Sequence, residues 1–230
     1  MPRGLFITGT EPRCGKTLIG CAVAFAAHSR GMRVGVMKPV ETGCREADGV
    51  LEPADARGLS FAAASDVPIE LICPYRYRSP LAPAAAADAD KVAPPDLTEI
   101  LDLYRKIETS SDIVIVEGAG GIMTPINWAS PLSGQKDNAD LARALNLDIA
   151  IVIGNRIGCL NAAMLTIQYA KSRGLGIIGM ILNDIDAATS PATENNEASL
   201  RKMTEIPVLG RIRFKQPVPR EIIDALLNSF

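Results

Sequence analysis

The sequence of 230 residues has little of the chemistry on which several enzyme classes depend. Its one histidine, His28, follows an apolar helical run, which favours a structural or surface role, and no serine–histidine or cysteine–histidine catalytic arrangement is expected around it. The five cysteines are odd in number and show no zinc or redox spacing: they are Cys14, Cys21, Cys44, Cys73 and Cys159. We therefore expect reduced, mostly buried thiols, with Cys14 filling the underside of a glycine-rich loop.

The chain also lacks a surplus of positive charge and any long apolar run. Lys and Arg number 24 against 26 Asp and Glu, so no surface for a nucleic-acid backbone or an anionic membrane is indicated. The apolar run at residues 4–9 is too short for a signal peptide, and no run approaches the roughly 18 residues of a membrane span. We expect a cytoplasmic protein with one α/β domain, residues 1–230, because the chain is short for two.

Apolar, β-branched segments alternate with helical segments along most of the chain. Buried strands are predicted at residues 4–9, 33–40, 111–121, 147–155, 175–184 and 206–213, and helices at 17–31 and 159–174. This alternation indicates an α/β fold with a mostly parallel sheet and helices on both faces. The Ala/Pro-rich stretch "SPLAPAAAADAD" has the composition of a linker, but strands lie on each side, which favours an insertion around 41–95 within one domain.

The stretch "GTEPRCGKT", residues 9–17, lies between a predicted strand and a predicted helix. Five residues separate Gly9 from Gly15, where the usual phosphate-binding loop has four. Backbone N–H groups at a helix N-terminus bind anions, Lys16 would reach the outer phosphates, and the Thr17 hydroxyl would bind Mg²⁺. A glycine turn capped by Thr17 is the alternative, but the placement favours a nucleotide site and a fold like that of the P-loop NTPases.

Polar residues also follow three other predicted strands, in "KPVETG", "VEGAGG" and "LND". Ligands of open parallel sheets bind at the carboxyl ends of the strands, so these segments should converge. Glu117 stands at a strand tip, and the glycines after it allow a phosphate to approach the backbone. Lys38 ends its strand. A lysine there can simply extend to the surface, but its position near the transferred phosphate favours an electrostatic role in phosphoryl transfer. Asp55 is a weaker candidate, because a lone aspartate there is often a helix cap.

These blocks make the chain resemble the dethiobiotin synthetases, biotin-pathway enzymes that close a ureido ring with ATP and carbon dioxide. The resemblance rests on "FITGTEPRCGKT", "KPVETG", "IVIVEGAGG", "IGNRIGCLNAAMLT" and "ILND", in the family's order, and on "CPYRYRSPLAPAAAA" between the second and third blocks. It spans nearly the whole chain, and the longer spacing in the loop is the family's own. It implies ATP, CO₂ and 7,8-diaminononanoate as substrates, Mg²⁺ as cofactor and a homodimer.

The resemblance also implies a role for each matching residue. Lys16 and Lys38 would be catalytic, and the metal ligands would be Thr17, Asp55 and Glu117. The residues expected to bind ATP are Arg13, Cys14, Gly15, Lys16, Thr17, Leu18, Asp55, Glu117, Gly118, Ala119, Gly120, Asn183, Asp184, Pro207, Val208 and Leu209. Among them, Asn183 would read the adenine and the last three would close over the base. Thr42 would contact the diamine, and a turn of the partner subunit would hold its carboxylate, namely Gly158, Cys159, Leu160 and Asn161.

Two positions depart from the family, and three alternatives stay open. Pro12, which lacks a backbone donor, stands where the family usually has Thr, and Arg13 stands where Gly or Glu is common. An amidating ligase of the cobyrinic acid diamide synthase type normally carries a glutaminase domain, for which this length leaves no room. A partitioning or cell-division ATPase needs a signature lysine where this chain has Glu11. A non-catalytic regulatory module of the same fold would not need Lys38 and the candidate metal ligands.

Overall fold

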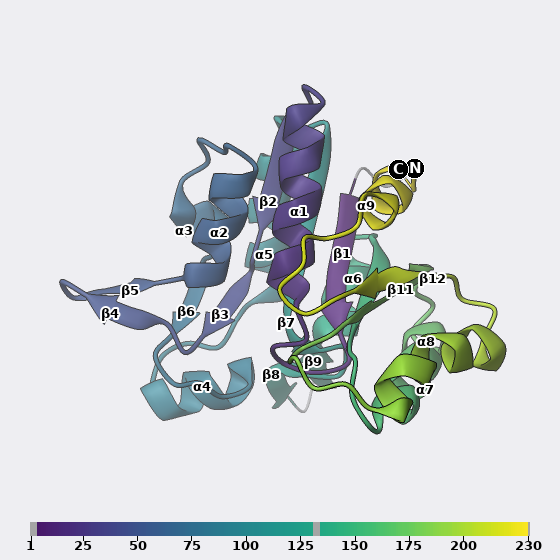
Figure 1. Cartoon of the computed structure of the whole chain (residues 1–230). Helices are drawn as coiled ribbons and strands as arrows, with labels where there is room; N and C mark the ends of the chain where they lie inside the picture. The colour runs from purple at the N-terminus through teal and green to yellow at the C-terminus, as the bar shows by residue number, and fades with distance from the viewer. Residues whose placement is uncertain (1–3, 131–133, 230) are drawn as a thin grey trace.

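The computed structural model describes residues 4–130 and 134–229, and its centre is a parallel sheet (Figure 1). Within those residues six strands pair in the order β12-β11-β10-β1-β7-β2, with every neighbouring pair parallel. The strands are β1 (Gly4–Gly9), β2 (Val34–Met37), β7 (Ile113–Gly121), β10 (Asp148–Gly154), β11 (Ile177–Asn183) and β12 (Val208–Ile212). The predicted strands and the α/β fold are therefore confirmed.

Helices cover both faces of the sheet, which explains why its strands are apolar nearly throughout. One face carries α1 (Lys16–Ser29), α2 (Ala54–Ala62), α3 (Ile69–Ile72) and α9 (Arg220–Leu227). The other carries α5 (Leu97–Thr109), α6 (Asn138–Ala144), α7 (Cys159–Ser172) and α8 (Pro191–Met203). Along β1, Leu5 and Ile7 pack with the first set and Phe6 with the second, as the two-residue period of a strand requires.

Residues 41–95 form ordered structure at one side of the sheet. There β3 (Val40–Thr42) pairs in parallel with β6 (Tyr75–Tyr77), and β4 (Arg45–Ala47) pairs with β5 (Val50–Glu52) in a hairpin that projects at the left of Figure 1. The Ala-rich stretch becomes α4 (Pro83–Asp90), whose small side chains are partly buried. It is thus a packed helix.

A second hairpin, β8 (Pro125–Ser130) with β9 (Gly134–Asp137), leads directly into α6. The sequence patterns did not predict this hairpin or α6. No helix in the described ranges is both long and apolar enough to cross a membrane.

Candidate active site

The glycine-rich loop joins the carboxyl end of β1 to the first residue of α1. Gly15 adopts a φ of 107°, a left-handed conformation that glycine takes without strain, and a Cβ there would lie 2.4 Å from Asn183 Nδ2. Lys16 is buried, and its Nζ donates a hydrogen bond to Glu11 O at 3.1 Å. Burial raises the pKa of the Cys14 thiol, against the opposing effect of the Lys16 ammonium. Cys14 is therefore a packed thiol beneath the loop.

Three residues that were predicted from separate segments as metal ligands, Thr17, Asp55 and Glu117, lie close together beside this loop and around Lys38. The Lys38 ammonium forms ion pairs with Glu117 and with Asp55, whose Oδ2 is 3.1 Å away. Thr17 Oγ1 donates to Glu117 Oε1 at 3.0 Å. Lys38 and Glu117 are buried, whereas the Asp55 side chain is 42% exposed. Strand β7 places Glu117 opposite Ile7 of β1, which explains how a residue 100 positions from Thr17 reaches it.

The charge state of Lys38 follows from its neighbours. Burial by itself lowers the pKa of Lys38, because it disfavours the ammonium, but the carboxylates of Glu117 and Asp55 outweigh burial. The net effect holds the pKa of Lys38 above its ordinary value. The site therefore contains a permanent buried cation at neutral pH.

Glu41 belongs to the site although the sequence did not single it out. Its Oε1 accepts a hydrogen bond from Asp55 N and its Oε2 one from Ala56 N, both at 3.0 Å. Helix α2 begins after Pro53, which offers no side-chain cap, so Glu41 satisfies N–H groups that would otherwise lack a partner. Burial raises the pKa of Glu41, and the two backbone hydrogen bonds oppose that rise. Glu41 thus fixes the helix end that carries Asp55.

A cleft of about 760 Å³ opens over this cluster. Its lining includes the polar residues Lys16, Thr17, Lys38, Asp55 and Glu117. It also includes Val40, Pro80, Leu81 and Pro83, which we call its apolar wall. Other residues predicted for the site also line the cleft, namely Arg13, Gly15, Thr42, Ala119 and Gly120. The cleft can therefore contact a charged group through its polar residues and a hydrocarbon chain through its apolar wall.

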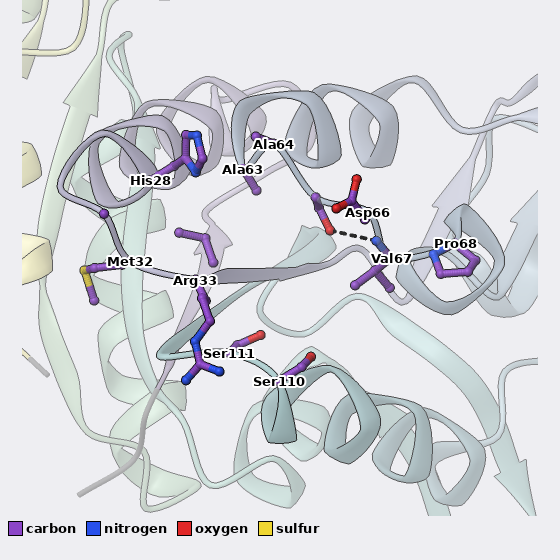
Figure 2. Close-up of a pocket in the computed structure, with 13 residues that line it drawn as sticks. His28, Met32, Arg33, Ala63, Ala64, Asp66, Val67, Pro68, Ser110 and Ser111 are labelled. Carbon is purple, nitrogen blue, oxygen red and sulfur yellow. Dashed lines mark hydrogen bonds between the residues drawn. The ribbon is translucent and has the colours of Figure 1, made fainter.

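A second hollow, of about 660 Å³, lies near the amino end of β2 (Figure 2). His28, Ala63 and Ser110 line it from the carboxyl ends of α1, α2 and α5. Arg33 projects beside it but is engaged by Asp112. No residue predicted for catalysis or binding lies in its lining.

Asn183, which was predicted to read the adenine, and its neighbour Asp184 both have hydrogen-bond partners within the chain. Asn183, at the carboxyl end of β11, donates its amide to Cys14 O at 2.9 Å and so lies against the glycine-rich loop. Asp184 accepts from Asn155 Nδ2 at 2.7 Å and pairs with Arg211 at 2.8 Å. Both side chains are therefore held by hydrogen bonds within the chain at the edge of the sheet that carries the loop.

The structure does not bring residues 207–209 to that edge. Val208 pairs with Met180 near the start of β12, whereas Asn183 pairs with Ile212 at its end. Pro207, Val208 and Leu209 therefore lie toward the amino end of their strand, away from the loop. A parallel strand at residues 206–213 places its first residues at the end of the sheet away from the loop. This placement does not agree with the role in closing over the base, which the resemblance implied for residues 207–209.

The turn predicted to hold a carboxylate begins α7, at the carboxyl end of β10. Gly158 has a φ of 89° and precedes Cys159, the first helical residue, and Asn161 is exposed. In the described part of the chain, the lining of the cleft includes none of residues 158–161. Arg156, just before the turn, pairs with Glu11 of the glycine-rich loop. The turn and the loop are thus joined within one chain by a contact that lies outside the lining of the cleft.

The parallel sheet, the loop between β1 and α1, and the buried Lys16 followed by Thr17 at its end define a P-loop NTPase. A family model described as an AAA domain matches residues 3–221, and the chain belongs to that family.

Solved structures show the same fold at low sequence identity. A ParA family ATPase from Chlorobium tepidum TLS is 15% identical with a TM-score of 0.56, over 99% of this chain and 90% of that one. The septum site-determining protein MinD from Pyrococcus horikoshii OT3, complexed with Mg-ADP, is 17% identical with a TM-score of 0.56, over 98% and 86%. The cell division ATPase MinD from Pyrococcus furiosus is 15% identical with a TM-score of 0.52, over the whole of both chains.

Proposed function

We propose that this chain is a dethiobiotin synthetase. It would convert 7,8-diaminononanoate, CO₂ and ATP to dethiobiotin, ADP and phosphate, within one ATP-binding domain that carries the insertion around 41–95. The observation that carries the proposal is the position of Lys38, a buried ammonium between two carboxylates in the lining of a cleft that also has an apolar wall. A phosphoryl transfer needs the charge, and an aliphatic diamine fits the apolar wall.

The donor set beside Lys38 fits Mg²⁺. Thr17, Asp55 and Glu117 offer hydroxyl and carboxylate oxygens, which this ion prefers, and it keeps several waters and phosphate oxygens as its other ligands. Glu117 Oε2 is buried and has no hydrogen-bond partner among the described residues, so this oxygen is available to bind a cation. The MinD structure with Mg-ADP supports the same pairing of nucleotide and ion. When bound, Mg²⁺ would offset negative charge on the phosphates.

The chemistry requires positioning and charge stabilisation more than a covalent nucleophile. One amine of the substrate adds to CO₂ and gives a carbamate. A carbamate oxygen then attacks the γ-phosphorus of ATP, and ADP leaves. The second amine attacks the carbonyl carbon of the mixed anhydride and expels phosphate, which closes the ring. Lys16 and Lys38 would stabilise the charge on the oxygens during the transfer, while the apolar wall holds the methylene chain and Thr42 contacts the diamine.

The site would be completed by a second copy of the chain. The turn at 158–161 offers N–H groups at the start of a long helix, which suits the substrate's carboxylate. Ile157, just before α7, is 79% exposed, and Leu165 of α7 is 62% exposed. Asn161 and Leu165 share one face of the helix at four-residue spacing. Large exposed apolar side chains so close to the turn support an interface there. We propose a homodimer in which each turn serves the partner's cleft.

A switch ATPase is the second candidate, because the ParA and MinD structures share the fold. Against it, the place of the signature lysine of that group holds Glu11, and Glu11 is paired with Arg156. A test is whether ATP turnover depends on the other substrates. We expect phosphate release only when both the diamine and bicarbonate accompany ATP and Mg²⁺. Turnover that ignores both compounds would favour the switch ATPase.

A further inference from the structure

Asn138, the first residue of α6, makes an unusual pair of contacts with the segment that follows Glu117. Its Nδ2 donates hydrogen bonds to Ala119 O and to Gly121 O, each at 2.7 Å. The side chain is buried, with 1% of the residue exposed. One amide group therefore joins two peptides of the glycine segment, which we define as residues 118–121.

The helix itself does not need this side chain. Asp137 caps α6 and forms a capping box with Asp140, with hydrogen bonds of 3.0 and 3.3 Å. From α7, the Tyr169 hydroxyl donates to Asp137 and Arg173 pairs with Asp140. The start of α6 is thus held firmly without Asn138, which can act as a fixed support for the glycine segment.

The Asn138 amide has a cost that its contacts with the glycine segment must offset. Its Oδ1 is buried and has no hydrogen-bond partner among the described residues. A buried acceptor without a partner is unfavourable for folding, and an apolar side chain of similar size would avoid the loss. The contacts of Nδ2 are the only feature of the described structure that requires an amide at this position.

These contacts fix the direction of the peptide groups. Because the peptide is trans, the C=O of Ala119 and the N–H of Gly120 point to opposite sides, so the N–H points away from Asn138. The lining of the cleft includes Ala119 and Gly120 but not Asn138. Gly120 has a φ of 76°, and a Cβ there would lie 2.5 Å from Thr124 Oγ1. The segment is therefore held in one conformation next to the proposed phosphate site.

We infer that Asn138 is a positioning residue for nucleotide binding. It holds the glycine segment so that the Ala119–Gly120 peptide presents its N–H toward bound phosphate. Asn138 does not itself touch the nucleotide. The inference rests on the proposed nucleotide site, but it does not depend on which reaction follows binding.

The test is the affinity of the full-length chain for Mg-ADP, measured by calorimetry together with the Tm of each variant. Asn138→Asp keeps the shape but replaces the two donated hydrogen bonds with repulsion between oxygens. It should weaken Mg-ADP binding by about tenfold or more, since each tenfold corresponds to only about 1.4 kcal/mol. Asn127→Asp is the matched control, because the Asn127 amide also donates to a backbone carbonyl, Pro95 O, at 3.0 Å. It should bind Mg-ADP as the wild type does.

Asn138→Leu separates positioning from stability. It removes the unsatisfied Oδ1, but it also leaves the carbonyls of Ala119 and Gly121 without their donor. Because these two effects oppose each other, its Tm should stay closer to that of the wild type than the Tm of Asn138→Asp does, while Mg-ADP binding weakens. Amide hydrogen exchange in residues 118–121 should become faster. A folded Asn138→Leu chain with wild-type affinity would overturn the inference, whatever Asn138→Asp does. A wild-type chain that fails to bind Mg-ADP would instead refute the proposed nucleotide site.

Discussion

The ammonium of Lys38 contacts the carboxylates of both Glu117 and Asp55, at the place where the metal ligands were predicted to converge. The lysine thus balances the buried negative charge of Glu117. A metal bound by the same carboxylates would take over that task, which would leave Lys38 free to act on the substrate. The relationship leads to a prediction about stability as well as one about turnover.

Replacing Lys38 by Met should destabilise the fold, because Glu117 would stay buried without its partner. Breaking a buried pair in this way costs about 3–5 kcal/mol. Millimolar Mg²⁺ should restore part of the lost stability in Lys38→Met and have less effect on the wild type. Chemical denaturation with and without Mg²⁺ measures both effects.

The difference in stability between the wild type and Lys38→Met should depend on pH in a way that follows from the raised pKa of Lys38. A lysine whose pKa is raised in the folded state contributes stability that is complete below its unfolded pKa, about 10.5, and is lost only above it. The stability difference between wild type and Lys38→Met should therefore be the same at pH 7 and pH 9. A difference that vanishes by pH 9 would show that Lys38 is not held as an ammonium by Glu117.

Glu41→Gln should loosen the helix end that carries Asp55. The amide of Gln can accept through one atom only, so one of the two N–H groups of α2 loses its acceptor. Loss of such a cap costs about 1 kcal/mol of stability. The Mg²⁺ concentration needed for half-maximal turnover should also rise, because Asp55 is less well placed. Glu197→Gln, at an exposed helical pair, is the control and should change neither quantity; an unchanged Mg²⁺ requirement in Glu41→Gln would remove Glu41 from the site.

Leu81→Ala should affect the diamine and spare the nucleotide. Leu81 is 48% exposed on the apolar wall of the cleft, where hydrocarbon contact with the substrate would bury it further. Loss of that contact should raise KM for the diamine by about three- to tenfold, given about 0.8 kcal/mol for each buried CH₂ group. Val92→Ala alters another exposed apolar residue, one outside the cleft lining, and serves as the control. A KM increase for ATP alone would place the diamine elsewhere.

The composite site predicts subunit complementation. Lys16→Ala disables the loop of its own subunit, and Asn161→Asp places a negative charge in the turn offered to the partner. Each homodimer should be weakly active, whereas mixed dimers should regain one intact site. Ile157→Asp should shift the chain toward a monomer in analytical ultracentrifugation and lower activity with it. Full activity in a monomer would rule out a shared site.

The parts of the site that could be predicted from sequence are those carried by local patterns. Gly15, Lys16 and Thr17 follow from a loop between a strand and a helix, and Glu117 from a charge at the end of a buried strand. Glu41 could not be found in this way, because the N–H groups it binds are 14 and 15 residues away and no repeated spacing marks the contact. Asn138 was missed for the same reason, since its carbonyl partners are 19 and 17 residues away.

For residues 207–209, the predicted strand direction agrees with their position in the structure, whereas the position implied by the resemblance does not. The sequence pattern predicted the parallel strand that became β12, and its direction puts Pro207 at the end away from the loop. The role in base binding came only from matching an apolar stretch, which carries little positional information. The hairpin β8–β9 was missed because neither strand has the sustained apolar alternation from which strands are predicted.

The most direct test of the proposed function is mass spectrometry of the reaction with ATP, Mg²⁺, ¹³C-bicarbonate and 7,8-diaminononanoate. We expect dethiobiotin that carries one heavy carbon in its ureido carbonyl, formed in equal amount with ADP, and no such product from the Lys38→Met chain. ADP formed without any labelled ring product, by a folded wild-type dimer, would contradict the assignment as a dethiobiotin synthetase.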